Sequence, residues 1–208
     1  PPVALGGTVL VLSGIYLAEH GWKKRTLTGG LMMAKEIELR ERLLGRPGKP
    51  MIEAIAADAV ADEAMLAALF GFVYSGEDPL RWRAAWAIEK VTARYPQCVV
   101  GERSKMMQLC MQDNIPDGLR RLLLSILYSL ATDSELDVDF YNFLLGRMCD
   151  LQSPPGVQSL AMKLACRMSR VDSDLQEEFL CILRNMEKDY YSAGLKSVLR
   201  NCLKRKKY

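Results

Sequence analysis

The chain has 208 residues, of which 50% are hydrophobic and 25% charged, and its formal net charge is +3 at pH 7. This length suits one domain with a sizeable core, and this composition excludes a disordered or fibrous protein. A net charge this small does not by itself indicate nucleic-acid binding, so the distribution of charge matters more.

The first 33 residues differ from the rest of the chain. Residues 3–18 are apolar but interrupted by glycine, and they are shorter than the roughly 20 residues of a membrane-spanning helix. The basic run 23–25 follows this stretch, whereas a signal peptide has its basic residues first. We expect residues 1–33 to be a non-native or disordered segment, with Met32 or Met33 as the natural start. The alternative is that residues 3–18 are a native membrane anchor on a cytoplasmic body.

From residue 34 onward the sequence predicts helices only. Residues 35–44 form a charged amphipathic pattern that ends at the breaker cluster 45–48, and an alanine-rich helix is predicted over 51–59. No later stretch alternates as a β-strand does. The domain 34–208 is therefore expected to be all-α.

Prolines mark an internal repeat in this domain. Pro79, Pro116 and Pro155 each begin a predicted helix, and a further step of similar size leads to Ser192. Each of these helices is preceded by another; the four partners are predicted over residues 62–74, 102–111, 136–149 and 174–186. A two-helix unit that recurs about every 40 residues has the HEAT/armadillo period.

The repeat predicts an α–α superhelix. One amphipathic hairpin cannot bury its apolar face alone, but stacked hairpins form a continuous core. In the helix after Pro116, for example, Leu119, Leu123 and Ile126 recur at helical spacing. We expect a right-handed solenoid of about four to five HEAT-like helical hairpins.

The stretch DPLRWRAAWAIEKV, residues 78–91, resembles the second helix of HEAT-like repeats. The resemblance rests on an aspartate–proline start, an arginine one turn later and small residues where helices press together: Asp78, Pro79, Arg83, Ala84, Ala85 and Ala87. Asp78 is expected to be the N-cap. Trp82 and Trp86 have helical spacing in an alanine-rich helix, which favours a core position for both.

Basic residues gather on the predicted second helices, which line the concave face in HEAT-like arrays. This separation predicts a basic concave face that binds an acidic protein segment or the phosphate backbone of a nucleic acid. The residues expected to act there as charge-assisted donors are Arg81, Arg83, Arg120, Arg121, Lys163, Arg167 and Arg200.

The same separation of charge has a second explanation that requires no partner. The helix dipole favours acids at helix starts and bases at helix ends. Asp62, Asp137 and Asp174 stand at predicted starts, while Arg94 and Arg170 stand at predicted ends. Capping therefore accounts for part of the asymmetry.

Metal, cofactor and common catalytic motifs are not found in the sequence. The six cysteines contain no C-x-x-C pair, and most lie in apolar helical patterns, so we expect small buried residues in a reducing cytoplasmic compartment. The single histidine, His20, falls in the doubtful N-terminal segment. We therefore assign no catalytic residue, no metal ligand and no small-molecule cofactor.

A distant similarity to the HEAT-like DNA alkylation repair family leaves an alternative open. Those proteins use a basic groove, aromatic residues against the lesion and a carboxylate near the sugar. Trp82, Trp86 and Glu89 would form the corresponding candidate pocket here, although the family's aspartate one turn after a tryptophan is missing. The favoured hypothesis is non-catalytic binding of an acidic protein partner. The alternative is a DNA-binding protein, including a relative of the alkylpurine DNA glycosylases.

Overall fold

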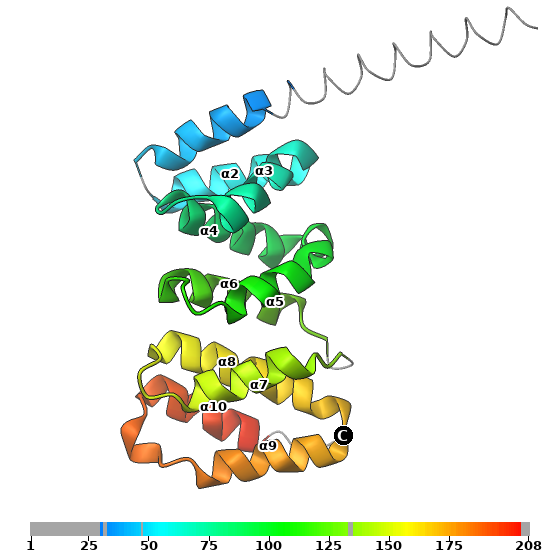
Figure 1. The fold of residues 1–208 in the computed structure, drawn as a ribbon, viewed down its shortest axis with the longest axis vertical. Coiled ribbons are helices and arrows are strands. Elements are labelled where there is room, and N and C mark those ends of the chain that lie inside the picture. Colours follow the sequence, from blue (N-terminus) through cyan, green and yellow to red (C-terminus); the bar gives the residue numbers. More distant parts are fainter. Residues whose placement is uncertain (1–29, 31–32, 47, 133–134, 205–208) are drawn as a thin grey trace, which may run out of the picture.

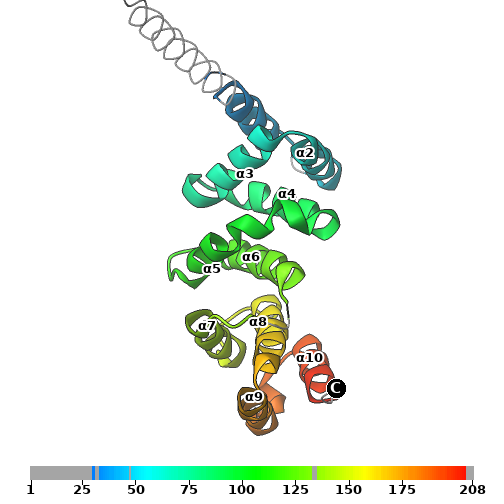
Figure 2. The same ribbon diagram turned by 90° about the vertical axis from the view of Figure 1, so that its right-hand side faces the viewer.

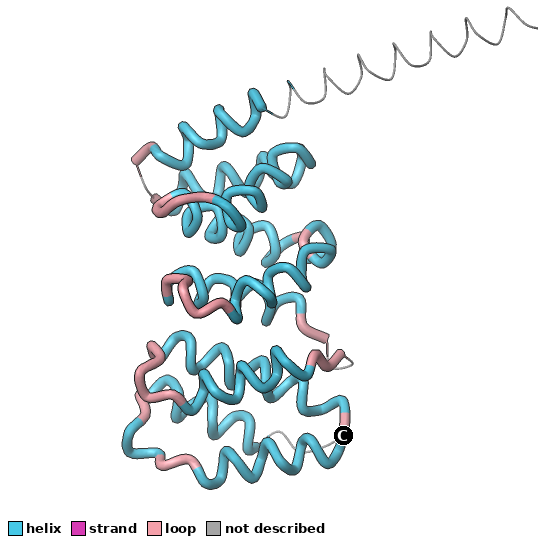
Figure 3. The backbone as a smooth tube through the Cα atoms, viewed as in Figure 1, coloured by secondary structure: helices cyan, strands magenta, loops and turns pink. Residues whose placement is uncertain are grey.

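The computed structural model describes residues 30, 33–46, 48–132 and 135–204 (Figure 1). In this part of the chain every regular element is a helix, and no strand is present (Figure 3). A first helix covers residues 33–44. The others are α2 (Lys49–Ala61), α3 (Glu63–Ser75), α4 (Leu80–Arg94), α5 (Arg103–Met111), α6 (Asp117–Leu130), α7 (Val138–Cys149), α8 (Pro155–Met168), α9 (Ser173–Asn185) and α10 (Ala193–Lys204). Short 3-10 turns lie at Pro96–Cys98, Val100–Glu102, Ser169–Val171 and Lys188–Tyr190.

The helices form consecutive hairpins that stack along one axis. The pairs are residues 33–44 with α2, then α3 with α4, α5 with α6, α7 with α8 and α9 with α10 (Figure 1). The second helices contact one another in the order α2, α4, α6, α8, α10, so they form one continuous layer. The prediction of an all-α array of about four to five HEAT-like hairpins is confirmed.

The array is curved, and the layer of second helices lies on its hollow side. In Figure 2 this layer is on the right, and α2 and α10 stand further out than α6 and α8 between them. The first helices α3, α5, α7 and α9 form the opposite, convex layer. Side chains that point outward from the second helices therefore line the concave face.

The apolar stripes of the helices meet in one core along the whole array. In α6 the residues Leu119, Leu123 and Ile126 are buried, as the helical spacing predicts. In α4 the small residues Ala84, Ala85 and Ala87 are completely buried, and α4 packs there against α2, α3 and α6. Small side chains let these helices approach closely, which explains the alanine-rich pattern.

Aspartates start three of the first helices. The carboxylates of Asp62, Asp137 and Asp172 accept hydrogen bonds from backbone N–H groups at the starts of α3, α7 and α9. The expected cap at Asp78 is wrong. Helix α4 begins at Leu80 with Pro79 in the N-cap position, so Asp78 lies outside the cap. Proline has no side-chain acceptor that could cap the helix at this position.

The cysteines divide between core and surface. Cys110, Cys166 and Cys202 are buried as expected, whereas Cys98, Cys149 and Cys181 are exposed, so the expectation is wrong for these three. Burial raises the pKa of the Cys110 thiol to about 12, which keeps it protonated and unreactive. No cluster of potential metal ligands occurs among the described residues.

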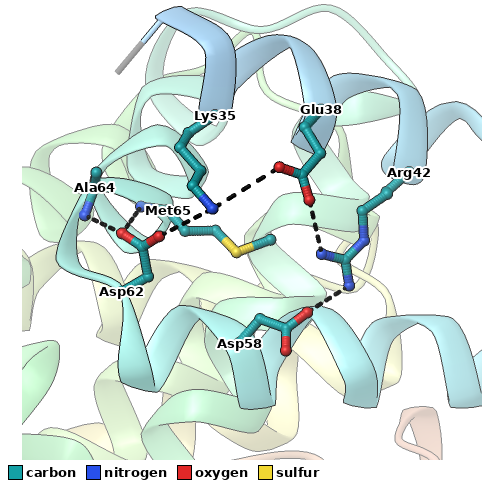
Figure 4. A network of polar contacts seen from close by, with 7 residues as sticks. All are labelled: Lys35, Glu38, Arg42, Asp58, Asp62, Ala64 and Met65. Carbon is teal, nitrogen blue, oxygen red and sulfur yellow. Dashed lines mark hydrogen bonds and ion pairs between the residues drawn. The ribbon is translucent and has the colours of Figure 1, made fainter. Parts of the chain in front are cut away.

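The N-terminal helix is attached to the array by a polar network (Figure 4). Arg42 binds Asp58 of α2 at 2.7 Å and Glu38 at 3.8 Å. Lys35 lies 3.3 Å from Asp62, whose other oxygen accepts from the first amides of α3. Asp62 thus connects residues 33–44, the α2–α3 junction and the start of α3.

Most of the predicted N-terminal segment 1–33 lies outside the described residues, as do residues 3–18. Within the described ranges, no helix is long and apolar enough to cross a membrane.

Two substitutions of Asp62 are expected to distinguish the contribution of helix capping to stability from the contribution of the carboxylate charge. Hydrogen bonds from the Met65 amide, together with bonds from Ala64 and Lys35, hold the pKa of Asp62 below 3.8. Its contribution to folding is therefore fully present above pH 4 and is lost as the pH falls through the lowered pKa. Asp62→Ala should lower the melting temperature at pH 7, and Asp62→Asn should preserve most of it, because asparagine also caps helices.

Both variants should show less loss of stability than wild type between pH 5 and pH 3, as measured by thermal unfolding followed by circular dichroism. Asp58→Asn is the control, because Asp58 pairs with Arg42 but caps no helix. A wild-type acid dependence in Asp62→Asn would contradict the assignment of the lowered pKa.

Candidate functional site

Four of the five second helices, α4, α6, α8 and α10, are strongly basic, whereas α2 carries Lys49 against Glu53 and Asp58. In α4, α6, α8 and α10 the only acids are Glu89 and Asp117. The basic residues of these four helices are Arg81, Arg83, Lys90, Arg94, Arg120, Arg121, Lys163, Arg167, Lys196, Arg200 and Lys204. Their side chains fall into two groups: one bonded to the protein itself, the other facing solvent.

Side chains near the starts of three second helices reach back across their own hairpins. Arg81 donates to the Val73 carbonyl at 2.9 Å, at the end of α3. Arg120 and Gln158 make the same eight-residue connection to the carbonyls that follow α5 and α7, at 2.6 Å and 2.8 Å. These carbonyls have no partner within their own helices. The three side chains therefore cap the first helix of each hairpin.

Arg83 and Arg167 form the corresponding bonds between neighbouring hairpins. Arg83 donates to the carbonyls of Leu43 and Gly45, at the end of the first helix. Arg167 donates to the Tyr128 carbonyl at 2.9 Å, and its guanidinium lies 4.3 Å from the centre of the Tyr128 ring. Both cations face the negative end of a helix dipole, which stabilises them there.

Arg120 is the most deeply buried of the predicted binding residues, with 2% of its surface exposed. Its guanidinium lies 5.8 Å from the centre of the Phe143 ring in α7, and Arg147 approaches the same ring at 5.4 Å. Phe143 thus contacts cations from two helices, which joins the α5–α6 hairpin to the next one. The charged group of Arg120 therefore interacts with groups of the protein itself, the Gln112 carbonyl and the Phe143 ring.

Arg121, Lys163 and Arg200 belong to the second group. Arg121 and Arg200 are exposed and Lys163 is partly exposed, on three successive second helices. None of the three side chains forms a hydrogen bond or an ion pair with another described residue. Lys163 instead lies over the Tyr128 ring, with its ammonium 5.7 Å from the ring centre. Of the seven predicted residues, these three leave their charge accessible.

A small pocket opens between α4 and α6 on the same face. It has a volume of about 320 Å³ and is lined by Trp82, Trp86, Gly118, Arg121 and Leu122. The centres of the two indole rings are 5.5 Å apart, with an interplanar angle of 48°. Trp82 is 39% exposed, so the expectation that it is a core residue is wrong. Trp86 is partly buried and packs against the core.

Glu89 does not complete the candidate pocket. It is absent from the pocket lining, and its carboxylate pairs with the Lys90 ammonium at 3.4 Å. The pocket therefore combines aromatic surface with a cation, without a carboxylate among the described residues that line it. This arrangement suits an apolar or aromatic group next to a negative charge.

A larger cavity of about 570 Å³ lies at the C-terminal end of the array, beside α7 and α9. Its lining includes Glu178, Glu187, Tyr190 and Tyr191, and no cation among the described residues takes part. The Tyr191 hydroxyl donates to the Cys149 carbonyl at 3.3 Å, which ties the last hairpin to the end of α7. Because its described charged residues are acidic, this cavity is not part of the basic surface.

Three residues that the structure brings into these contacts are not among the predicted binding residues. Tyr128 supports both Lys163 and Arg167, Phe143 stacks with Arg120, and Gln158 caps α7. The eight-residue spacing between a polar side chain and the preceding helix end is a signal that could have found Gln158. The two ring contacts join helices of different repeats and have no local signal in the sequence.

Comparison with protein families agrees with this architecture. The model of the HEAT repeat domain matches residues 39–206. The chain therefore belongs to the HEAT repeat domain family, whose helical arrays serve as scaffolds for protein interactions. No curated protein matches the chain significantly. No solved structure does so either.

The adjacent residues Arg120 and Arg121 provide a matched test of the two groups of cations. Arg120→Met should destabilise the protein by about 1–3 kcal/mol, because it leaves the Gln112 carbonyl without its donor. Arg121→Met should change the free energy of unfolding by less than about 0.5 kcal/mol, because Arg121 is an exposed surface residue. Urea unfolding followed by circular dichroism measures both values. Equal effects would contradict the division into engaged and accessible arginines.

Proposed function

We propose that the protein is a non-catalytic scaffold that binds an acidic segment of a partner protein through the concave layer of second helices. The observation that carries this proposal is the set of three accessible cations, Arg121, Lys163 and Arg200, on successive second helices. Charges left without carboxylate partners on a surface attract a ligand of opposite sign.

The exposed aromatic surface favours a protein partner over a nucleic acid. Trp82 and Trp86 form a pocket beside Arg121, and aromatic rings with arginine are enriched at the energetic centres of protein interfaces. Phosphate contacts from Arg121, Lys163 and Arg200 alone would give a log–log salt slope of only about −3 on duplex DNA. Arg81, Arg83, Arg120 and Arg167 are unsuited to add to this number, since their guanidinium groups already donate to backbone carbonyls.

The glycosylase alternative has no comparable support. Its chemistry requires a carboxylate that stabilises positive charge on the sugar. Glu89 is the only acid in α4, and it lies outside the pocket lining.

Reversing two of the accessible charges tests the proposal. Binding of a fluorescein-labelled, glutamate-rich peptide to the full chain would be measured by fluorescence anisotropy. Arg121→Glu combined with Lys163→Glu should weaken binding at least about tenfold, because like charges then face each other. The control combines Lys105→Glu with Arg184→Glu, which changes the net charge equally on the first helices α5 and α9.

The control pair should leave the affinity within about twofold of wild type, because its charges lie on the opposite layer and are screened by salt. Equal losses in both double variants would show that net charge alone drives binding, against the proposal. Tighter binding of labelled duplex DNA than of the peptide, with a steep salt dependence, would replace the proposal with the nucleic-acid alternative.

A further inference from the structure

The pocket between α4 and α6 differs from the rest of the concave face because it joins apolar surface to an accessible cation. Its two indole rings provide aromatic walls, and Leu122 adds an aliphatic side chain. Among the described residues of the lining, Arg121 alone carries a charge. Its volume of about 320 Å³ is at the small end of the range for ligand pockets, roughly 300–1,000 Å³.

The charge of the lining restricts the ligand. A cationic group would be repelled by Arg121 and would meet no carboxylate in the lining among the described residues. A neutral aromatic ring gains stacking on the indoles, and a carboxylate beside it gains a charge-assisted bond to the guanidinium. The pocket therefore fits an aromatic side chain that is flanked by acids.

Arg121 extends from the pocket toward α8, where Lys163 provides a second cation. The aliphatic part of the Arg121 side chain lies close to Gly156. A Cβ added at Gly156 would lie 3.1 Å from the Cδ of Arg121. Arg121 thus reaches from α6 to the start of α8, and Lys163 follows further along α8, over Tyr128. An extended segment held at the pocket would reach a second cation on the next repeat.

We propose that this pocket anchors one aromatic side chain of the partner segment, with the acidic residues beside it held by Arg121 and Lys163. This inference rests on the proposed function, and it specifies the sequence character of the partner: an acidic segment that contains an aromatic residue. The aromatic anchor adds affinity and fixes the register of the segment along the second helices.

A larger side chain at Gly118 can fill the pocket without removing any existing side-chain contact. Gly118 lines the pocket, and a Cβ added there would meet no atom within 4 Å. Gly118→Leu places an aliphatic side chain at the pocket, and leucine has a higher helix propensity than glycine. Gly146 in α7 is also exposed with open space at its Cβ, so Gly146→Leu is the matched control on the convex layer.

The experiment compares three labelled peptides by fluorescence anisotropy on the full chain. The first is glutamate-rich with one phenylalanine, the second has serine in place of phenylalanine, and the third has glutamine in place of every glutamate. The phenylalanine peptide should bind wild type about tenfold more tightly than the serine peptide, which is the ratio expected for one well-placed aromatic contact. The glutamine peptide should bind most weakly.

Gly118→Leu and Trp82→Ala should each remove most of this tenfold advantage while the affinity for the serine peptide stays unchanged. Gly146→Leu should preserve the advantage. Equal wild-type affinities for the phenylalanine and serine peptides would overturn the anchor and leave acidic binding intact. An advantage that persists in both pocket variants, or equal binding of the glutamine peptide, would also overturn it. Absence of binding by both acidic peptides would overturn the proposed function together with the anchor.

Discussion

The array depends on how the carbonyl groups at helix ends are satisfied. Every α-helix leaves about four carbonyls without an internal partner, and stacking places many of these ends against neighbouring helices, away from water. The protein meets this demand with side chains from the second helices. Arg81, Arg120 and Gln158 close their own hairpins, whereas Arg83 and Arg167 bind carbonyls of the preceding hairpin. All five side chains therefore stabilise helix ends, and the bonds of Arg83 and Arg167 also join two pairs of neighbouring hairpins.

This arrangement explains part of the separation of charge between the two layers. Aspartates begin α3, α7 and α9 because their carboxylates accept from free amides, and arginines follow the turn because they reach back to free carbonyls. Four of the eleven basic residues of α4, α6, α8 and α10 thus have a structural role: Arg81, Arg83, Arg120 and Arg167. Only the cations that point outward and have no partner, such as Arg121 and Arg200, support an argument about binding.

The sequence was sufficient to predict the fold but not the division among its arginines. Helical spacing and proline-marked turns determine the hairpins, and both are local properties of the chain. Arg120 and Arg121 are neighbours with the same chemistry, yet one step along a helix rotates the side chain by about 100°. One therefore enters the core and the other faces solvent. The predicted core position of Trp82 is wrong for a related reason. Alanines occupy the inner face of α4, and the larger Trp82 ring lies on the outer face.

The two groups of cations also differ in their response to solvent. Arg120 is almost fully buried, so salt screens its interactions with Gln112 and Phe143 weakly. The accessible cations lie in water, where a Debye length of about 8 Å at physiological salt limits their attraction to a partner. Packing depends on the buried positions, whereas the proposed recognition depends on the outward ones. Under this proposal, substitutions of outward cations on the concave face change the partner without disturbing the stack. In a repeat array, the position of a residue on the inner or outer side of its helix decides whether it serves packing or can face a partner.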